Sequence, residues 1–112
     1  MLTNKSFLEG LNYFNNEMYL KAHEPFEDIW KHAKDEKLFL QGLIQISVAF
    51  YHYNNQNLRS AMILLKRGNS YIKEYKEIYN ELNLELFCKD IDNIIKLIEK
   101  NETIFFPKLN FI

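Results

Sequence analysis

Three side chains that could do chemistry stand at helical spacing in the first third of the chain. His23, Glu27 and Trp30 follow one another at intervals of four and three residues, so a helix would place them along one face. Glu24 stands beside this stripe as a further carboxylate. An imidazole and a carboxylate one turn apart can bind a polar ligand, hold a metal ion or exchange a proton.

A second polar stripe follows on the segment that we expect to be the next helix. Its members are Gln41, Gln45 and His52. The connection between the two segments is short, so the two helices should pack antiparallel. That pairing brings Glu27 close to Gln45 and His23 close to Val48, and it leaves His52 about one turn beyond Val48. If the stripes face each other, two histidines, one carboxylate and two amides meet across one interface.

Two interpretations of this constellation remain open. In the first, the side chains form a hydrogen-bonded network or a small polar binding cleft, because buried polar groups need partners. In the second, His23, Glu27 and His52 hold a divalent metal ion, since two imidazoles and a carboxylate suit zinc or non-haem iron. Glu24 would then be a nearby base. The segment is not the zinc-protease motif, because Glu27 stands where that motif has its second histidine.

The elements that position these residues follow from apolar residues at helical spacing along the whole chain. Thr3 is the expected cap of the first helix, and Asn57 the expected cap of the fourth. Pro25 is expected in the first turn of the second helix, which then starts near Ala22, because inside a helix proline costs about 3 kcal/mol; a bend of the helix there is the alternative. The predicted helical segments are 7–14, about 19–33, 37–53, 58–79 with a weak point at 68–70, and 87–98.

Residues 14–22 resemble residues 53–61 at an offset of 39, each with a turn rich in asparagine followed by an alanine. Two helix pairs that share one packing solution explain this similarity. We therefore predict an all-α fold, one domain over residues 1–112. It is a bundle of about five helices in antiparallel hairpins, similar to tetratricopeptide helix pairs.

Composition excludes several classes of function. Fourteen basic and fifteen acidic residues give a net charge of -1, which argues against a nucleic-acid binder. The single Cys88 excludes an internal disulfide and a cysteine-based zinc site. Residues 38–58 carry no formal charge, but eight polar side chains argue against a membrane span. We expect a cytoplasmic protein without membrane contact, and its lysine-, asparagine- and isoleucine-rich composition is typical of AT-rich bacterial coding.

The last ten residues are rich in large apolar side chains. Such a tail, residues 103–112, is expected to dock on its own chain or on a second subunit, because water would otherwise cover it. A homo-oligomer held together through this tail is therefore one hypothesis.

Two motifs resemble those of the domain-of-unknown-function 309 family. The first is Phe14-Asn15, followed by Ala22-His23-Glu24, Glu27 and Trp30. The second is Leu40-Gln41-Gly42-Leu43-Ile44-Gln45, followed by Ala49, His52, Ala61 and Leu64-Leu65. Together they cover roughly residues 14–66. The resemblance implies a small all-helical domain of the kind found in bacteria, archaea and plastids, and it implies no particular activity.

The resemblance also suggests that the polar residues belong to one family feature. Its members are His23, Glu24, Glu27, Trp30, Gln41, Gln45 and His52. The chain departs from the family at two turns, where Glu17 and Gln56 stand at positions that tend to be glycine. Pro25 is also unusual for the family.

Three functions follow as hypotheses. The first is a non-enzymatic binding or adaptor domain that offers the polar cleft to a protein or small ligand and needs no cofactor. The second is a metal-dependent, hydrolase-like enzyme that uses His23, Glu27 and His52. The third is a structural homo-oligomer.

Overall fold

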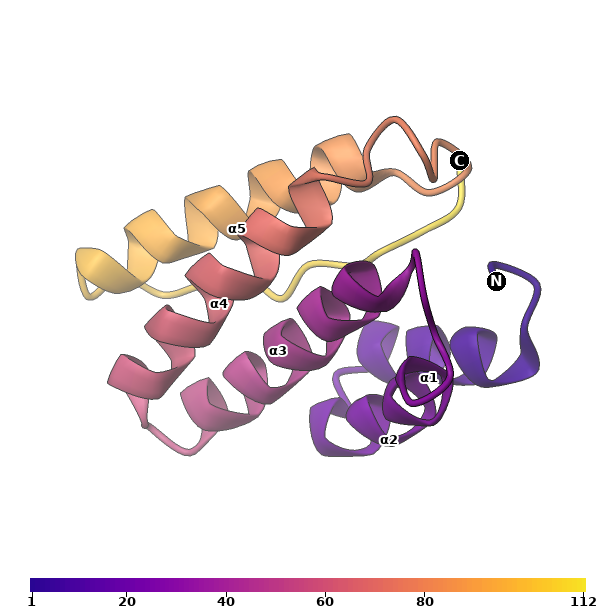
Figure 1. The fold of residues 1–112 in the computed structure, drawn as a ribbon. Coiled ribbons are helices and arrows are strands. Elements are labelled where there is room, and N and C mark those ends of the chain that lie inside the picture. The colour runs from indigo at the N-terminus through magenta and orange to yellow at the C-terminus, as the bar shows by residue number, and fades with distance from the viewer.

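The five helices of the chain pack in sequence order, each against the next. The computed structural model describes all residues 1–112. In Figure 1, α3 lies between α2 on one side and α4 on the other, and α5 covers α4. The helices are α1 (Lys5–Asn15), α2 (Tyr19–Trp30), α3 (Lys37–Asn54), α4 (Leu58–Lys73) and α5 (Leu84–Glu99). The predicted all-α bundle of five helices is therefore confirmed.

Buried side chains from every helix and from the tail form one continuous core of 26 residues. Aromatic rings dominate its centre. Phe14 of α1 lies edge-on to Phe50 of α3 and to Phe87 of α5, with ring centroids 6.2 and 5.7 Å apart. The first helix is thereby tied to the third and the fifth, which are far from it in sequence.

Asparagine side chains cap three of the five helices, α1, α4 and α5. Asn4 precedes α1, and its Oδ1 accepts hydrogen bonds from the backbone N–H groups of Ser6 and Phe7 at 2.8 and 3.3 Å. The expected cap at Thr3 is thus wrong by one residue, and asparagine is the stronger capping residue of the two. Asn57 caps α4 as predicted, because its Oδ1 accepts from the N–H of Ser60 at 3.4 Å.

The hairpins α1–α2 and α3–α4 each contain the same kind of turn. Glu17 and Gln56 occupy equivalent positions with φ angles of 62° and 63°. In each turn the next N–H donates to the carbonyl of the third residue from the helix end: Met18 to Tyr13 and Asn57 to His52, both at 2.9 Å. This is the Schellman pattern that ends many helices. The similarity between the two segments at an offset of 39 residues therefore reflects a repeated turn and packing geometry. The likeness to tetratricopeptide helix pairs remains a prediction.

Pro25 lies inside α2 and not in its first turn, so that prediction is wrong. The turn at Glu17 fixes where the chain can begin the helix. Tyr19 and Ala22, which are 3% and 0% exposed, then hold the first turn against the core. Burial of this turn offsets the backbone hydrogen bond that proline cannot make.

The fourth helix ends at Lys73, so the prediction that Tyr75 and Tyr79 belong to it is wrong. Their rings instead pack on Phe39 of α3, with centroids 5.4 and 4.8 Å away. The Tyr75 hydroxyl donates a hydrogen bond to the Asp35 carbonyl at 2.7 Å. Aromatic contacts with α3 thus replace the last turn of the predicted helix.

The closest approach of two helices occurs where the fourth helix was expected to be weak. A Cβ on Gly68 would lie 2.8 Å from the Gly42 carbonyl oxygen, and a Cβ on Gly42 equally close to the Gly68 carbonyl oxygen. Only glycine permits this contact between backbones. The pair fixes α4 against one side of α3.

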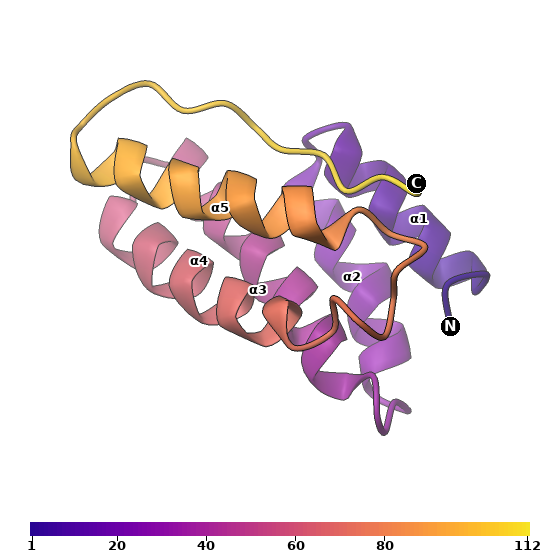
Figure 2. The same ribbon diagram turned by 90° about the horizontal axis from the view of Figure 1, so that it is seen from above.

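The C-terminal tail runs back along α5 and ends beside its start (Figure 2). Leu109 is fully buried, and its backbone N–H and C=O both bond the side chain of Asn15 at 2.9 Å. Phe111 pairs with Leu82 in an isolated bridge. The predicted docking is confirmed on the chain itself. A contact with a second subunit could use only the apolar side chains of the tail that remain exposed, which are Phe105, Phe111 and Ile112.

None of the five helices combines the length and apolar character needed to cross a membrane.

Candidate functional site

A groove of about 350 Å³ lies between α2 and α3, where the two polar stripes were expected to meet. It is called the α2–α3 groove below. The six residues that line it are His23, Glu27, Trp30, Gln41, Ile44 and Gln45. Five of the seven predicted site residues are therefore brought together, because α2 and α3 pack with these faces toward each other.

The histidine of the groove is held by its own helix. Its Nδ1 bonds the Leu20 carbonyl oxygen one turn back, and this carbonyl can only accept, so Nδ1 carries the proton. The other ring nitrogen, Nε2, lies 3.7 Å from the Glu27 Oε2. That separation is longer than a hydrogen bond. His23 and Glu27 thus stand side by side with both polar ends available to a ligand.

Two buried polar atoms of the groove residues have no hydrogen-bond partner. They are Nε1 of Trp30 and Oε1 of Gln45. The face of the Trp30 ring also meets a cation, because Lys37 Nζ lies 4.5 Å from the ring centroid. A cation at this distance over an indole ring is attracted by its π-electrons.

Glu24 and His52 do not line the groove. Glu24 projects toward α1 and borders a separate depression with Tyr13 and Lys21. His52 lies in the last turn of α3, beside the ring of Tyr51. It is seven residues beyond Gln45, which corresponds to about 10 Å along the helix axis. The helical rise therefore carries His52 past the end of the groove.

The predicted metal ligands do not form one site. No three histidine, cysteine, aspartate or glutamate side chains lie close enough together to hold a metal ion. His23 and Glu27 are neighbours, but His52 is not the third member of their group. The expectation that His23, Glu27 and His52 converge is corrected by this geometry.

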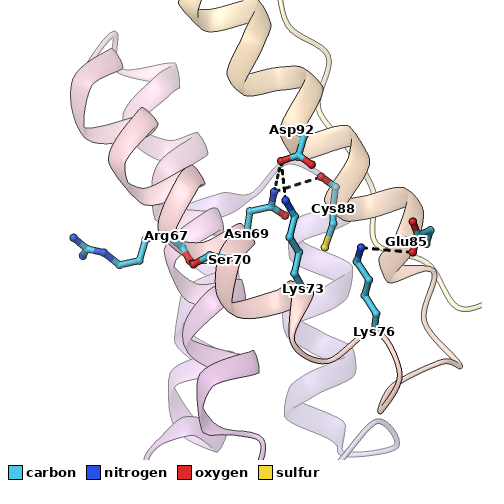
Figure 3. Close-up of polar contacts among 8 residues, drawn as sticks. All are labelled: Arg67, Asn69, Ser70, Lys73, Lys76, Glu85, Cys88 and Asp92. Carbon is cyan, nitrogen blue, oxygen red and sulfur yellow. Dashed lines mark hydrogen bonds and ion pairs between the residues drawn. The ribbon is translucent and has the colours of Figure 1, made fainter.

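A second polar cluster, at the α4–α5 interface, was not predicted (Figure 3). Asn69 is 2% exposed, and its Nδ2 donates to Asp92 Oδ1 at 2.9 Å and to the Cys88 carbonyl at 3.4 Å. Lys73 Nζ pairs with the same Asp92 oxygen at 3.1 Å. The signal that could have revealed it is the place of Asn69 on the apolar face of α4, between the buried Leu65 and Ile72.

Cys88 belongs to this interface and is buried. Burial raises the pKa of its thiol to about 11, and the nearby Lys76 and Lys73 lower it only in part. A thiol of this kind is rarely ionised near neutral pH, so it is a poor nucleophile.

Comparisons with other proteins cover the part of the chain that contains the groove. The family model described as "Domain of unknown function (DUF309)" matches residues 7–64, which include all six groove residues. The uncharacterized protein YpuF of Bacillus subtilis (strain 168) is 29% identical over 84 residues, 72% of this chain and 48% of that protein. The chain thus spans about half the length of that relative. With the model matching more than half of its residues, the chain belongs to the DUF309 family.

Proposed function

We propose that this chain is a non-enzymatic binding domain and that the α2–α3 groove binds a short segment of another protein. The observation that carries this proposal is the pair of unpartnered atoms, the Trp30 Nε1–H donor and the Gln45 Oε1 acceptor. Both atoms are shielded from solvent in the unbound protein, so the Trp30 and Gln45 side chains must turn toward the groove before a peptide unit, with its one acceptor and one donor, can bond them. A buried polar atom without a partner costs about 1–3 kcal/mol, which a bound peptide would recover.

The shape of the groove supports a peptide ligand. All six lining residues are partly exposed, so the groove is open along its length. Pockets for small molecules typically enclose most of their ligand, and about 350 Å³ is at the small end of their range. An open groove of this size accommodates one or two side chains of an extended segment. Trp30 and Ile44 provide apolar contact, and the Gln41 amide can bond a peptide backbone.

The side-chain chemistry of the groove supports binding over covalent catalysis. It contains one imidazole and one carboxylate but no serine, cysteine or lysine. The Nδ1 atom of His23 is also occupied, because it donates its hydrogen bond to the Leu20 carbonyl. Nucleophilic catalysis most often uses a hydroxyl, a thiol or an amine beside a base, and no such group lines this groove.

The fluorescence of Trp30 tests the proposal directly, because it is the only tryptophan in the chain. We would titrate the protein with a library of acetylated, amidated hexapeptides and follow the emission. A subset should give a saturable change. Gln45→Ala should weaken that binding by about tenfold, since it removes the buried acceptor. Glu24→Ala changes a residue of α2 outside the groove, so this variant should bind the peptides as tightly as the wild type does.

Two results would overturn this function. The first is that no hexapeptide changes either the Trp30 emission or the NMR amide signals of α2 and α3. The second is that Gln45→Ala binds every hexapeptide as tightly as the wild type. Chemical denaturation of both alanine variants controls for loss of folding.

A further inference from the structure

We infer that the segment bound in the α2–α3 groove presents an arginine side chain to Glu27 and Trp30. This inference rests on the proposed function and adds the chemical class of the ligand. It is argued from the balance of acceptors and donors in the groove, from an unpaired charge and from the aromatic surface beside it.

The groove contains one charged acceptor and several neutral polar groups. Glu27 provides the carboxylate, and Gln45 Oε1 has no partner. Because His23 Nδ1 bonds the Leu20 carbonyl, a neutral ring turns the lone pair of Nε2 toward Glu27 and the groove. The donors of the groove are the Trp30 N–H and the side-chain amides of Gln41 and Gln45, all of them uncharged. A cationic ligand with several N–H groups therefore complements the groove.

The carboxylate of Glu27 has no lysine or arginine partner in the chain. The lysine–carboxylate pairs of the chain are Lys73–Asp92 and Lys76–Glu85. The basic group beside Glu27 is the His23 ring at 3.7 Å, which forms an ion pair only when it is protonated. The Glu27 side chain is 45% exposed, so an incoming cation can reach it. The groove thus offers a negative charge that the fold itself leaves without a lysine or arginine partner.

The Trp30 ring already accepts a cation from its own chain. Lys37 Nζ lies 4.5 Å from the centre of the ring, although Lys37 is not among the residues that line the groove. This contact shows that the indole ring accepts a positive charge, on a face that Lys37 occupies in the unbound protein. A guanidinium stacks on such a face more readily than an ammonium does, because it is planar and more weakly hydrated.

Arginine combines these requirements in one side chain. Its planar group carries five N–H donors, of which two can pair with the Glu27 carboxylate. Its aliphatic stem can lie against Ile44, which is partly exposed in the groove. Lysine carries the charge but lacks the flat, multiply donating head.

The test compares two pentapeptides that differ in charge alone. They are acetyl-Ala-Leu-Arg-Leu-Ala-amide and its counterpart with citrulline, a neutral isostere, in place of arginine. The arginine peptide should bind about tenfold more tightly at low salt, and the difference should shrink at high salt. Glu27→Gln should remove the difference. Glu24→Gln, one turn away on α2 and outside the groove, should preserve it.

A second variant tests the role of the aromatic face. Lys37→Met removes the resident cation from Trp30 and should raise the affinity for the arginine peptide about twofold to fivefold. Equal affinity for the two peptides, or a charge preference that survives Glu27→Gln, would overturn the inference while leaving peptide binding intact. If neither these pentapeptides nor the hexapeptide library binds, the proposed function itself is wrong.

Discussion

The two sides of α3 contrast sharply. On the side of α4, Gly42 and Gly68 bring two backbones into contact, and the Asn69 cluster beyond them pairs its polar groups across to α5. On the side of α2, the interface leaves a groove, and Trp30 Nε1 and Gln45 Oε1 have no partner. Asn69 Oδ1 is the one unpaired atom on the closed side.

This difference separates polar residues that stabilise the fold from those that are free to bind. A polar side chain that holds helices together is buried and has specific partners, as the Asn69 amide has in Asp92 and the Cys88 carbonyl. A polar stripe that is partly exposed and incompletely bonded adds little to stability. Its unpaired polar groups can instead form hydrogen bonds with a ligand, and these bonds contribute to the free energy of binding.

The largest effect should come from closing the glycine contact. Gly68→Val would push a branched side chain into the Gly42 carbonyl and should lower the free energy of unfolding by about 3 kcal/mol or more. Ser70→Val, an exposed position two residues further along α4, is the matched control and should change it by less than about 1 kcal/mol. Urea denaturation measures both. Equal destabilisation of the two variants would mean that the helices can move apart at little cost.

The next effect sets one polar residue of each side against the other. Asn69→Leu removes the donor of the Cys88 carbonyl and leaves Asp92 with Lys73 alone, and it should cost about 2–3 kcal/mol of unfolding free energy. Gln45→Leu removes an acceptor that is already unpartnered, so it should cost less than about 1 kcal/mol or stabilise the fold. The opposite order would show that the groove stripe, and not the Asn69 cluster, is the structural network.

The burial of Cys88 at the α4–α5 interface should also make the free energy of unfolding depend on pH. Burial raises the pKa of the Cys88 thiol from 9.0 to about 11, so the folded protein keeps a proton that the unfolded chain releases. The resulting stability is complete below pH 9 and is lost as pH rises through about 11. At pH 10 the loss should be about 1 kcal/mol.

Cys88→Ala is the variant for this measurement. Its unfolding free energy should fall less between pH 8 and pH 10 than that of the wild type. Tyr19 and Tyr79 keep their contribution in both proteins, because burial raises the pKa of each phenol as well. Identical slopes in the two proteins would show that water reaches the Cys88 thiol in the folded state.

The smallest effect should be the same on both sides of α3. Glu17→Gly and Gln56→Gly each relieve a left-handed backbone and should raise the free energy of unfolding by about 0.5–1 kcal/mol. Asn101→Gly, at the end of α5 with a φ of 57°, should gain less, because asparagine tolerates this conformation. Thermal denaturation would compare the three. A gain at only one of the first two positions would mean that the two hairpins differ in backbone as well as in side chains.

Much of this contrast could be predicted from the sequence, because it depends on local periodicity. Helical spacing identifies the five helices and places His23, Glu27 and Trp30 on one face. The departure from glycine at Glu17 and Gln56 marks the two turns with positive φ. These features involve residues within a few turns of one another.

The remaining features depend on contacts between distant segments. The spacing of α4 alone suggests that Gly68 weakens the helix, and only its partner Gly42, 26 residues earlier, reveals a close packing contact. Pro25 was misplaced because the start of α2 is decided by the preceding turn and by burial of Tyr19. His52 keeps the correct helical face, yet the helix rise carries it beyond the groove.

The docked tail has a consequence for how the chain folds. Most contacts between helices join neighbours in sequence, and such local contacts form quickly. The hydrogen bonds between Asn15 and Leu109 instead join residues 94 positions apart, and closing so long a loop is entropically costly. The hairpins should therefore assemble first and the tail last. In native-state hydrogen exchange, the backbone amide of Leu109 should then open in a smaller unfolding event than the amides at the centre of α3.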